Sequence, residues 1–169
     1  RQAASEAEAQ RKAALRGWRR RFWQASPDHR GVPEAPGRVV TLVPDAQAVC
    51  WGMAFRVAHA QWQDIIAELD HRERNGYTRC TVALEFEDGG ATDAITYVAL
   101  ADNPSFIGPA PLAAMLRQIG EAHGPSGSNR EYVTRLAEHL THLNIHDEEV
   151  HGLHSALLAA DVAHEAMRS

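Results

Sequence analysis

The sequence predicts an α+β protein with a single domain that spans residues 1–169. Segments rich in β-branched and aromatic residues come first and end near Leu100, whereas helical spacing dominates the chain after that point. One helical segment lies between two pairs of strand-like segments. The chain has 169 residues, of which 44% are hydrophobic and 23% charged, so it is long enough to bury one core.

The N-terminal segment, residues 1–16, is rich in Ala, Glu and Gln, which predicts a helix. Ser5 followed by Glu8 fits a capping box at its start. Gly17 interrupts this pattern, and "RRFWQ" at 20–24 has the composition of a strand. Residues 26–38 contain three prolines and two glycines, so we expect a loop there.

The middle of the chain reads as two strand pairs with a helix between them. We expect strands at 39–44 and 48–57, with Pro44–Gln47 as their turn. A helix is predicted from His59 to the Asn75-Gly76 stop signal, because its apolar residues recur at helical spacing. The next two strands, 77–87 and 91–100, meet at Asp88-Gly89-Gly90, a hairpin signal. Three further helices are predicted at 110–122, 128–143 and 147–167.

The stretch "GWRRRFWQ", residues 17–24, has three arginines between three aromatic residues, and this composition is also typical of a single-stranded nucleic-acid surface. The formal net charge of −5 argues against that function, since phosphate binders usually carry a basic excess. We therefore expect a strand with Trp18 and Phe22 on one face and Trp23 on the other, its arginines solvated or paired, and no nucleic-acid partner.

The composition also limits the cellular compartment and the oligomeric state that we expect for this protein. No apolar run is long enough to cross a bilayer, and no secretory signal is visible. The two cysteines, Cys50 and Cys80, lie in apolar, strand-like surroundings, where free thiols behave as small hydrophobic groups. We expect a cytoplasmic protein that is a monomer or a weak homo-oligomer and has no membrane partner.

One candidate for acid–base chemistry lies in "LDHRERNGY", residues 69–77. A charged helix end is most simply a solvated surface. Glu73, however, falls in the last turn of its predicted helix, where the helix dipole disfavours the charged carboxylate. That raises the tendency of the group to hold a proton, as a general base near neutral pH requires. Tyr77 opens the strand that follows.

A second candidate block is "GPSGSNREYV", residues 124–133. Either Ser128 or Asn129 can cap the helix that follows, and Glu131 suits its first turn. These structural roles account for most of the block but leave Tyr132 unexplained.

Six of the ten histidines lie between His139 and His164. The spacings of His139, His142 and His146 would place them near one helix face, which can bind a metal. Asn144 and Asp147 indicate a helix break before His146, and no cysteine or fixed ligand motif accompanies the set. We expect a solvated polar face, no metal site and no cofactor.

Several blocks in one order resemble the glutathione-specific gamma-glutamylcyclotransferase family, also called ChaC-like. The blocks are "RRFWQASPDHRGVPEAPGRVVTLV", "LDHRERNGY", "DNPSFIGPAP", "GPSGSNREY" and "DEEVHGL", and the similarity runs from about Gly17 to near the C-terminus. The resemblance implies a small closed β-barrel flanked by helices. It also implies cleavage of glutathione, the small-molecule substrate, to 5-oxoproline and cysteinylglycine without a cofactor or a metal.

By this resemblance, Glu73 matches the catalytic glutamate of the family, which serves as general acid and base. Tyr77 and Tyr132 match positions that resemble substrate-site tyrosines. Asp64 falls where close relatives often have a second acidic residue, but its side chain is one methylene shorter, so a solvated helix face is the better interpretation. The proline-rich loop after "RRFWQ" is expected to border the substrate site.

The sequence differs from the family pattern at its N-terminus. The family opens with a strand and a Gly-Tyr-Gly-Ser-Leu-type loop, whose amides are expected to stabilise the oxyanion. This sequence contains no such loop, so the first strand is expected to be missing or replaced by the atypical segment 1–16. Three interpretations stay open: a fragment of an active enzyme, an inactive relative acting as a ligand- or protein-binding module, or a chain that obtains an edge strand from another chain. We expect very slow turnover of glutathione by the chain as printed.

Overall fold

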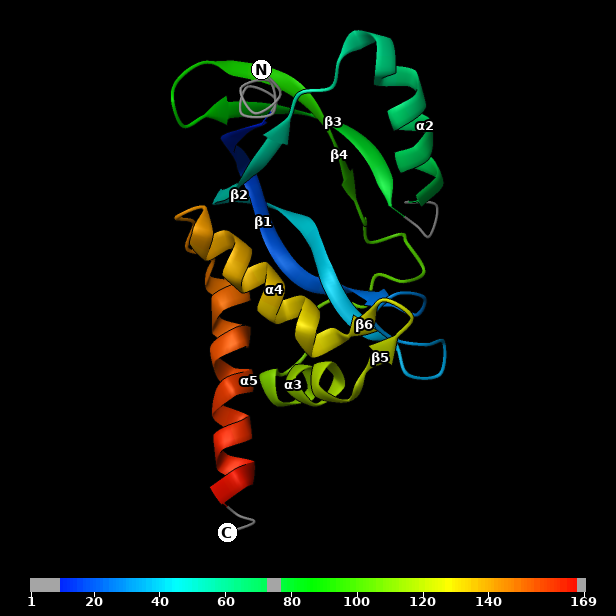
Figure 1. Ribbon diagram of the computed structural model, residues 1–169, viewed down its shortest axis with the longest axis vertical. Coiled ribbons are helices and arrows are strands. Elements are labelled where there is room, and N and C mark those ends of the chain that lie inside the picture. Colours follow the sequence, from blue (N-terminus) through cyan, green and yellow to red (C-terminus); the bar gives the residue numbers. More distant parts are fainter. Residues whose placement is uncertain (1–9, 73–76, 167–169) are drawn as a thin grey trace, which may run out of the picture. The chain divides into compact units, whose positions relative to one another are not determined.

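The computed structural model describes residues 10–72 and 77–166 (Figure 1). Strands come first and helices later, which confirms the predicted α+β class. The elements are β1 (Gln10–Ser26), β2 (Gly37–Phe55), η1 (His59–Gln61), α2 (Trp62–Arg72), β3 (Thr78–Phe86), β4 (Ala91–Val98), α3 (Leu112–Glu121), β5 (His123–Gly124), β6 (Gly127–Ser128), α4 (Asn129–His142) and α5 (Glu148–Ala166). The helices after residue 110 and the β3–β4 hairpin lie where the sequence predicts them.

The four long strands form one sheet in the order β2-β1-β3-β4, and β3 is antiparallel to both of its neighbours. A closed barrel would need the two outer strands, β2 and β4, to pair with each other. In the described residues they do not, so the expectation of a small closed barrel is wrong for this part of the chain. The sheet is open. What precedes β1 lies outside the described residues.

The chain divides into two compact units. One comprises Arg1–Arg19 and Leu42–Asn103, and the other comprises Arg20–Thr41 and Pro104–Ser169. Both β1 and β2 therefore contribute residues to each unit. The expectation of a single domain stays a prediction.

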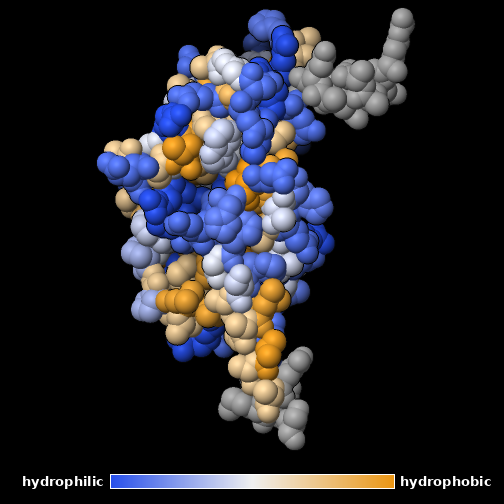
Figure 2. All heavy atoms as spheres, turned by 90° about the vertical axis from the view of Figure 1, so that its left-hand side faces the viewer, coloured by the Kyte–Doolittle hydropathy of each residue, from blue (hydrophilic) through white to orange (hydrophobic). Residues whose placement is uncertain are grey.

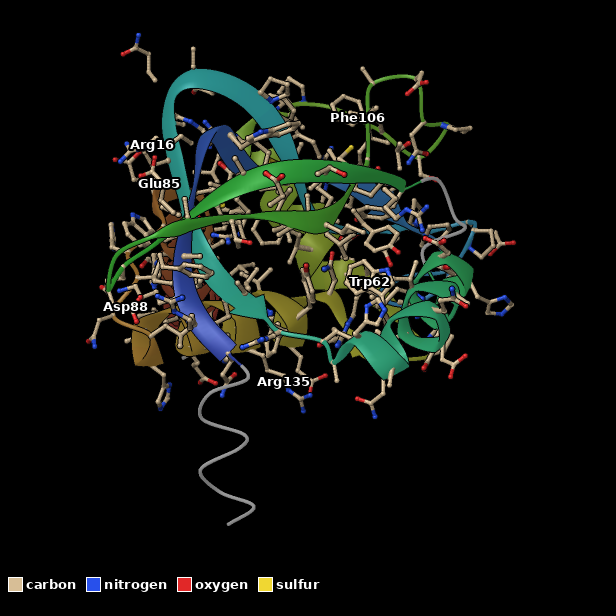
Figure 3. The ribbon with its side chains drawn as sticks, turned by 90° about the horizontal axis from the view of Figure 1, so that it is seen from above. Arg16, Trp62, Glu85, Asp88, Phe106 and Arg135 are labelled. Atoms are coloured by element: carbon tan, nitrogen blue, oxygen red, sulfur yellow. The ribbon has the colours of Figure 1, made fainter. Side chains whose placement is uncertain are left out.

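The first half of β1 corrects the helix predicted at 1–16, because residues 10–16 are a strand. Ala13 and Ala14 are buried and pair with Phe86 and Glu85 of β3. The basic residues beside them form ion pairs across the same ladder: Arg11 with Asp88, Lys12 with Glu87 and Arg16 with Glu85. The side chains of Arg16 and Glu85 lie together in Figure 3. Pairing with β3 thus overrides the helix propensity of an alanine-rich segment.

The second correction concerns β2, which runs without a break through the turn predicted at Pro44–Gln47. A proline cannot donate to a sheet ladder, but β2 is an outer strand, where proline is tolerated. Asp45 is held by an ion pair with Arg19 at 2.8 Å and accepts a hydrogen bond from the Gln47 amide at 3.0 Å. These local contacts satisfy the polar residues that suggested a turn.

The helices of the second unit bury a core of aliphatic residues. Its members come from all three helices and are Met115, Ile119, Val133, Ala137, Leu140, Val150, Leu153 and Leu157. The second half of α5 leaves Leu158 and Val162 more than half exposed, and this helix shows apolar surface toward its end in Figure 2. Among the described helices, none is both long and apolar enough to cross a membrane.

Phe22 should be a principal source of stability in the second unit, because its side chain is 0% exposed. We expect Phe22→Ala to lower the free energy of unfolding by about 3–5 kcal/mol, the cost of removing a buried aromatic ring. Phe55 is 70% exposed, so Phe55→Ala is the matched control and should change that free energy by less than about 0.5 kcal/mol. Urea denaturation of the two variants measures both. Equal losses would show that Phe22 is not a core residue.

Candidate active site

Of the three predicted site residues, the structure describes Tyr77 and Tyr132. Glu73 lies outside the described residues, directly after α2. Tyr77 is half-buried immediately before β3, in the first unit, and Tyr132 lies in the first turn of α4, in the second unit. Their proximity to one another stays a prediction.

Tyr132 is held by contacts from three segments of its own unit. Its hydroxyl oxygen accepts a hydrogen bond from the Val40 amide at 3.3 Å. Its ring meets Phe22 edge to face, with 6.2 Å between the ring centroids. The guanidinium carbon of Arg30 lies 5.5 Å from the centre of the same ring. The phenol is therefore held in place beside the Arg30 cation, which also forms an ion pair with Glu131 at 3.3 Å.

Arg30 comes from the proline-rich loop between β1 and β2. Its backbone amide donates to Ser26 Oγ at 3.0 Å, and its guanidinium reaches the Ser128 carbonyl at 3.4 Å and Glu131 Oε2 at 3.3 Å. These contacts connect the loop to the start of α4, so the loop backbone and the cation near Tyr132 are both anchored.

Three glycines allow this loop to pack against the segment before α4. A β-carbon at Gly31 would lie 2.2 Å from the Gly37 nitrogen, and one at Gly124 would lie 2.3 Å from the His29 carbonyl oxygen. A β-carbon at Gly37 would lie 2.5 Å from the Arg30 carbonyl oxygen. Real β-carbons do not approach backbone atoms so closely, so glycine is required at each of these positions.

The sequence left open whether Ser128 or Asn129 caps α4, and the structure decides between them. Ser128 is the cap, because its Oγ accepts from the Glu131 amide at 3.1 Å. Asn129 is instead wholly buried and binds the backbone of Arg38 in both directions. Its Oδ1 accepts from the Arg38 amide at 2.6 Å, and its Nδ2 donates to the Arg38 carbonyl at 2.7 Å.

Arg38 is the centre of a buried polar network that the sequence analysis missed. Its Nε donates to Gln118 Oε1 at 2.7 Å, and its Nη1 donates to the carbonyls of Phe22 and Gly108 at 2.9 and 3.1 Å. Burial lowers the pKa of Arg38 below its ordinary value, and the nearby charge of Glu149 opposes that shift. The sequence feature that could have indicated this network is a single basic residue at the start of an apolar strand.

The arginines of "GWRRRFWQ" are paired. Arg19 pairs with Asp45, whereas Arg20 and Arg21 pair with Asp147 and Glu149 at the start of α5, at 2.5 and 2.7 Å. Phe22 contacts Tyr132, and Trp23 contacts Phe106 edge to face at 6.1 Å, as expected for residues on opposite faces of a strand. Ion pairing and packing therefore account for this stretch.

In the first unit, Asp70 joins the end of α2 to the β3–β4 hairpin. Its Oδ1 accepts a hydrogen bond from the Tyr97 hydroxyl at 2.6 Å, and its Oδ2 pairs with Arg79 Nη1 at 2.8 Å. Burial first, and then the bond to Asp70, raise the pKa of Tyr97 from 10.0 to about 12. Asp64, earlier on the same helix, is exposed, as the sequence predicted.

The histidine region matches the predicted break. Helix α4 ends at His142, Asn144 has a φ of 52°, and α5 begins at Glu148. Within residues 10–72 and 77–166, no group of three or more His, Cys, Asp or Glu side chains could hold a metal ion. Both cysteines are free thiols. The expected absence of a metal site stays a prediction for the whole chain.

Comparison with known structures defines the class of fold. A crystal structure of a gamma-glutamyl cyclotransferase specific to glutathione from yeast superposes with a TM-score of 0.82 at 26% identity, covering 89% of this chain and 87% of that chain. The fold is that of the gamma-glutamylcyclotransferases.

The sequence comparisons define the family. The model of ChaC-like proteins matches residues 2–160, so the chain belongs to the ChaC-like family. The glutathione-specific gamma-glutamylcyclotransferase 1 of Danio rerio is 38% identical, and the match covers 86% of this chain and 77% of that protein. The glutathione-specific gamma-glutamylcyclotransferase of Schizosaccharomyces pombe is 33% identical, with 81% and 76% covered.

The paired hydrogen bonds of Asn129 should make it essential to the second unit. Asn129→Ala removes the partners of two buried backbone groups of Arg38, and each unpaired group costs about 1–3 kcal/mol. We therefore expect the free energy of unfolding to fall by about 2–5 kcal/mol. Ser128→Ala, the adjacent control, loses only a helix cap and should cost about 1 kcal/mol. Chemical denaturation gives both values, and a smaller loss for Asn129→Ala than for the control would contradict the assignment.

The phenol of Tyr97 should titrate with a midpoint near pH 12 rather than 10.0. Because the folded-state pKa is the higher one, this group contributes stability that is present below pH 10 and is lost as the pH rises through about 12. The phenolate absorbance of the parent minus that of Tyr97→Phe isolates the titration. Asp70→Asn should lower the midpoint without restoring the ordinary value, because burial remains. A midpoint near 10 in the parent would be inconsistent with this environment.

Proposed function

We propose that this chain is a glutathione-specific gamma-glutamylcyclotransferase, which cleaves glutathione to 5-oxoproline and cysteinylglycine. The observation that most strongly supports this proposal is the match to relatives of that name, at 33–38% identity over about three quarters of their length. The same fold in the yeast enzyme supports this proposal.

The reaction needs few chemical groups from the protein. The α-amine of the γ-glutamyl group attacks the γ-carbonyl of the same residue and closes a five-membered ring. Both reacting groups belong to one molecule, so the protein must hold the γ-glutamyl arm in a folded conformation and move protons. One carboxylate can take a proton from the attacking amine and give it to the departing amide nitrogen. Neither a metal nor a cofactor is required.

We assign the proton transfer to Glu73, which occupies the position of the family's catalytic glutamate in "LDHRERNGY". We assign substrate binding to Tyr77 and Tyr132. The surroundings of Tyr132 support its part, since its ring and hydroxyl are held in place by Phe22, Arg30 and the Val40 amide. The glycine-locked loop that carries Arg30 fits the expectation that this loop borders the substrate site.

The cytoplasm is the compartment that we propose, because both cysteines are free thiols and the substrate belongs to a reducing environment. We further propose a monomer or a weak homo-oligomer with no nucleic-acid partner. The pairing of Arg19, Arg20 and Arg21 with carboxylates supports the last point.

Replacing Glu73 provides the direct test. The protein to assay is this chain preceded by a strand and a Gly-Tyr-Gly-Ser-Leu-type loop, because the family resemblance places the oxyanion donors there. We expect that protein to release 5-oxoproline from reduced glutathione. Glu73→Gln should abolish the release, because an amide keeps the shape of the side chain but cannot carry the proton.

Glu68→Gln is the matched control, since Glu68 is an exposed carboxylate on α2, and its activity should equal that of the parent. Oxidised glutathione serves as the substrate control. Undiminished release by Glu73→Gln would remove this residue as the acid and base. No release by the parent would exclude the proposed function.

A further inference from the structure

Arg30 lies over the ring of Tyr132, a residue to which we assign substrate binding. Its guanidinium carbon is 5.5 Å from the ring centre, within the distance of about 6 Å at which a cation is attracted to an aromatic face. The side chain of Arg30 is only 15% exposed, so water and salt weaken this attraction little. Arg30 therefore constrains the position of the phenol.

The same guanidinium is bound to the start of the helix that carries the ring. Arg30 Nη1 forms an ion pair with Glu131 Oε2 at 3.3 Å, and it donates to the Ser128 carbonyl at 3.4 Å. Ser128 is the cap of α4, and Glu131 and Tyr132 both lie in the first turn. Because Glu131 already neutralises the cation, we expect Arg30 to orient Tyr132 rather than to bind a substrate carboxylate itself.

Gly127 leaves the space in which this ion pair forms. Its φ of 106° lies in the left-handed region that favours glycine. A β-carbon there would lie 2.4 Å from Glu131 Oε2 and 3.1 Å from Arg30 Nη1. Any other residue at this position would displace the carboxylate. The backbone before α4 therefore has the shape that the contact between Arg30 and Glu131 requires.

We propose that Arg30 is a positioning residue for Tyr132, holding the phenol in the orientation in which it binds glutathione. This inference rests on the proposed function. Arg30 touches no reacting atom in the proposal, and it acts through the orientation of the Tyr132 ring alone.

Loss of this contact should appear in KM more than in kcat, because the group that transfers the proton is unchanged. Arg30→Met removes the cation and keeps an unbranched stem. We expect it to raise KM for reduced glutathione by about three- to tenfold, as for a cation–π contact that is largely shielded from water. The value of kcat should stay within about twofold of the parent. The assay is 5-oxoproline release by the loop-bearing protein.

Arg135→Met is the matched control. Arg135 pairs with the other oxygen of Glu131 at 2.6 Å, but its side chain is 69% exposed. Its removal leaves the contact between Arg30 and Tyr132 in place, so KM should equal that of the parent. A rise in KM equal to that of Arg30→Met would show that the charge of the surface matters rather than the contact with the ring, and would overturn the proposal.

A double-mutant cycle separates positioning from an independent effect of Arg30. Tyr132→Ala should raise KM at least as much as Arg30→Met does. It also removes the ring on which Arg30 acts, so adding Arg30→Met to it should change KM by less than about twofold. A larger change would show that Arg30 acts on the substrate without Tyr132 and would overturn the proposal. A KM for Arg30→Met within about twofold of the parent would do the same.

NMR spectroscopy of the chain as printed supplies a measurement that needs no activity. The sequence has three tyrosines, so the Tyr132 ring signals of a protein labelled with ¹³C-tyrosine are identified by comparison with Tyr132→Phe. Arg30→Met should make the Tyr132 ring flip at least about twofold faster, whereas Arg135→Met should leave the flip rate unchanged. An unchanged rate in Arg30→Met would contradict the proposal. If the loop-bearing parent releases no 5-oxoproline, the proposed function fails, whereas the flip rates still decide whether Arg30 holds the ring.

Discussion

The buried guanidinium of Arg38 is the interaction on which the second unit depends. It receives no carboxylate at hydrogen-bond distance in the described residues, and instead donates to Gln118 of α3 and to the carbonyls of Phe22 and Gly108. Asn129 of α4 binds the backbone of the same residue. Burying a cation raises the free energy of the folded state unless its N–H groups find acceptors. The strand, the loop and helix α3 must therefore pack so that their acceptors reach this guanidinium together.

Contacts within this unit connect several of the motif blocks. The "RRFWQ" block pairs through Arg20 and Arg21 with the acidic residues that begin α5, and the "GRVV" block is bound by Asn129 of the "SGSNREY" block. The "IGPAP" block supplies the Gly108 carbonyl. Segments far apart in the sequence are thus connected by charge-assisted or paired hydrogen bonds.

An intramolecular cyclisation needs a folded substrate and one group that moves a proton. A site for this reaction therefore needs few reacting side chains, and most of its residues can serve to hold these in place. The described residues include two groups held by several contacts, the Tyr132 ring beside Arg30 and the Asp70 carboxylate between Tyr97 and Arg79.

The amino-acid sequence by itself determined the α+β class, the β3–β4 hairpin and the three C-terminal helices, because turn residues and apolar spacing are local signals. It also determined family membership and the candidates Glu73, Tyr77 and Tyr132 through ordered motif blocks. Only the tertiary structure decided that residues 10–16 are a strand and that β2 passes through Pro44, because partners on β3 and an outer position in the sheet outweigh local propensity. The partners of Arg38 and Asp70 were likewise decided there, since long-range hydrogen bonds join residues whose separation along the chain carries no periodic signal.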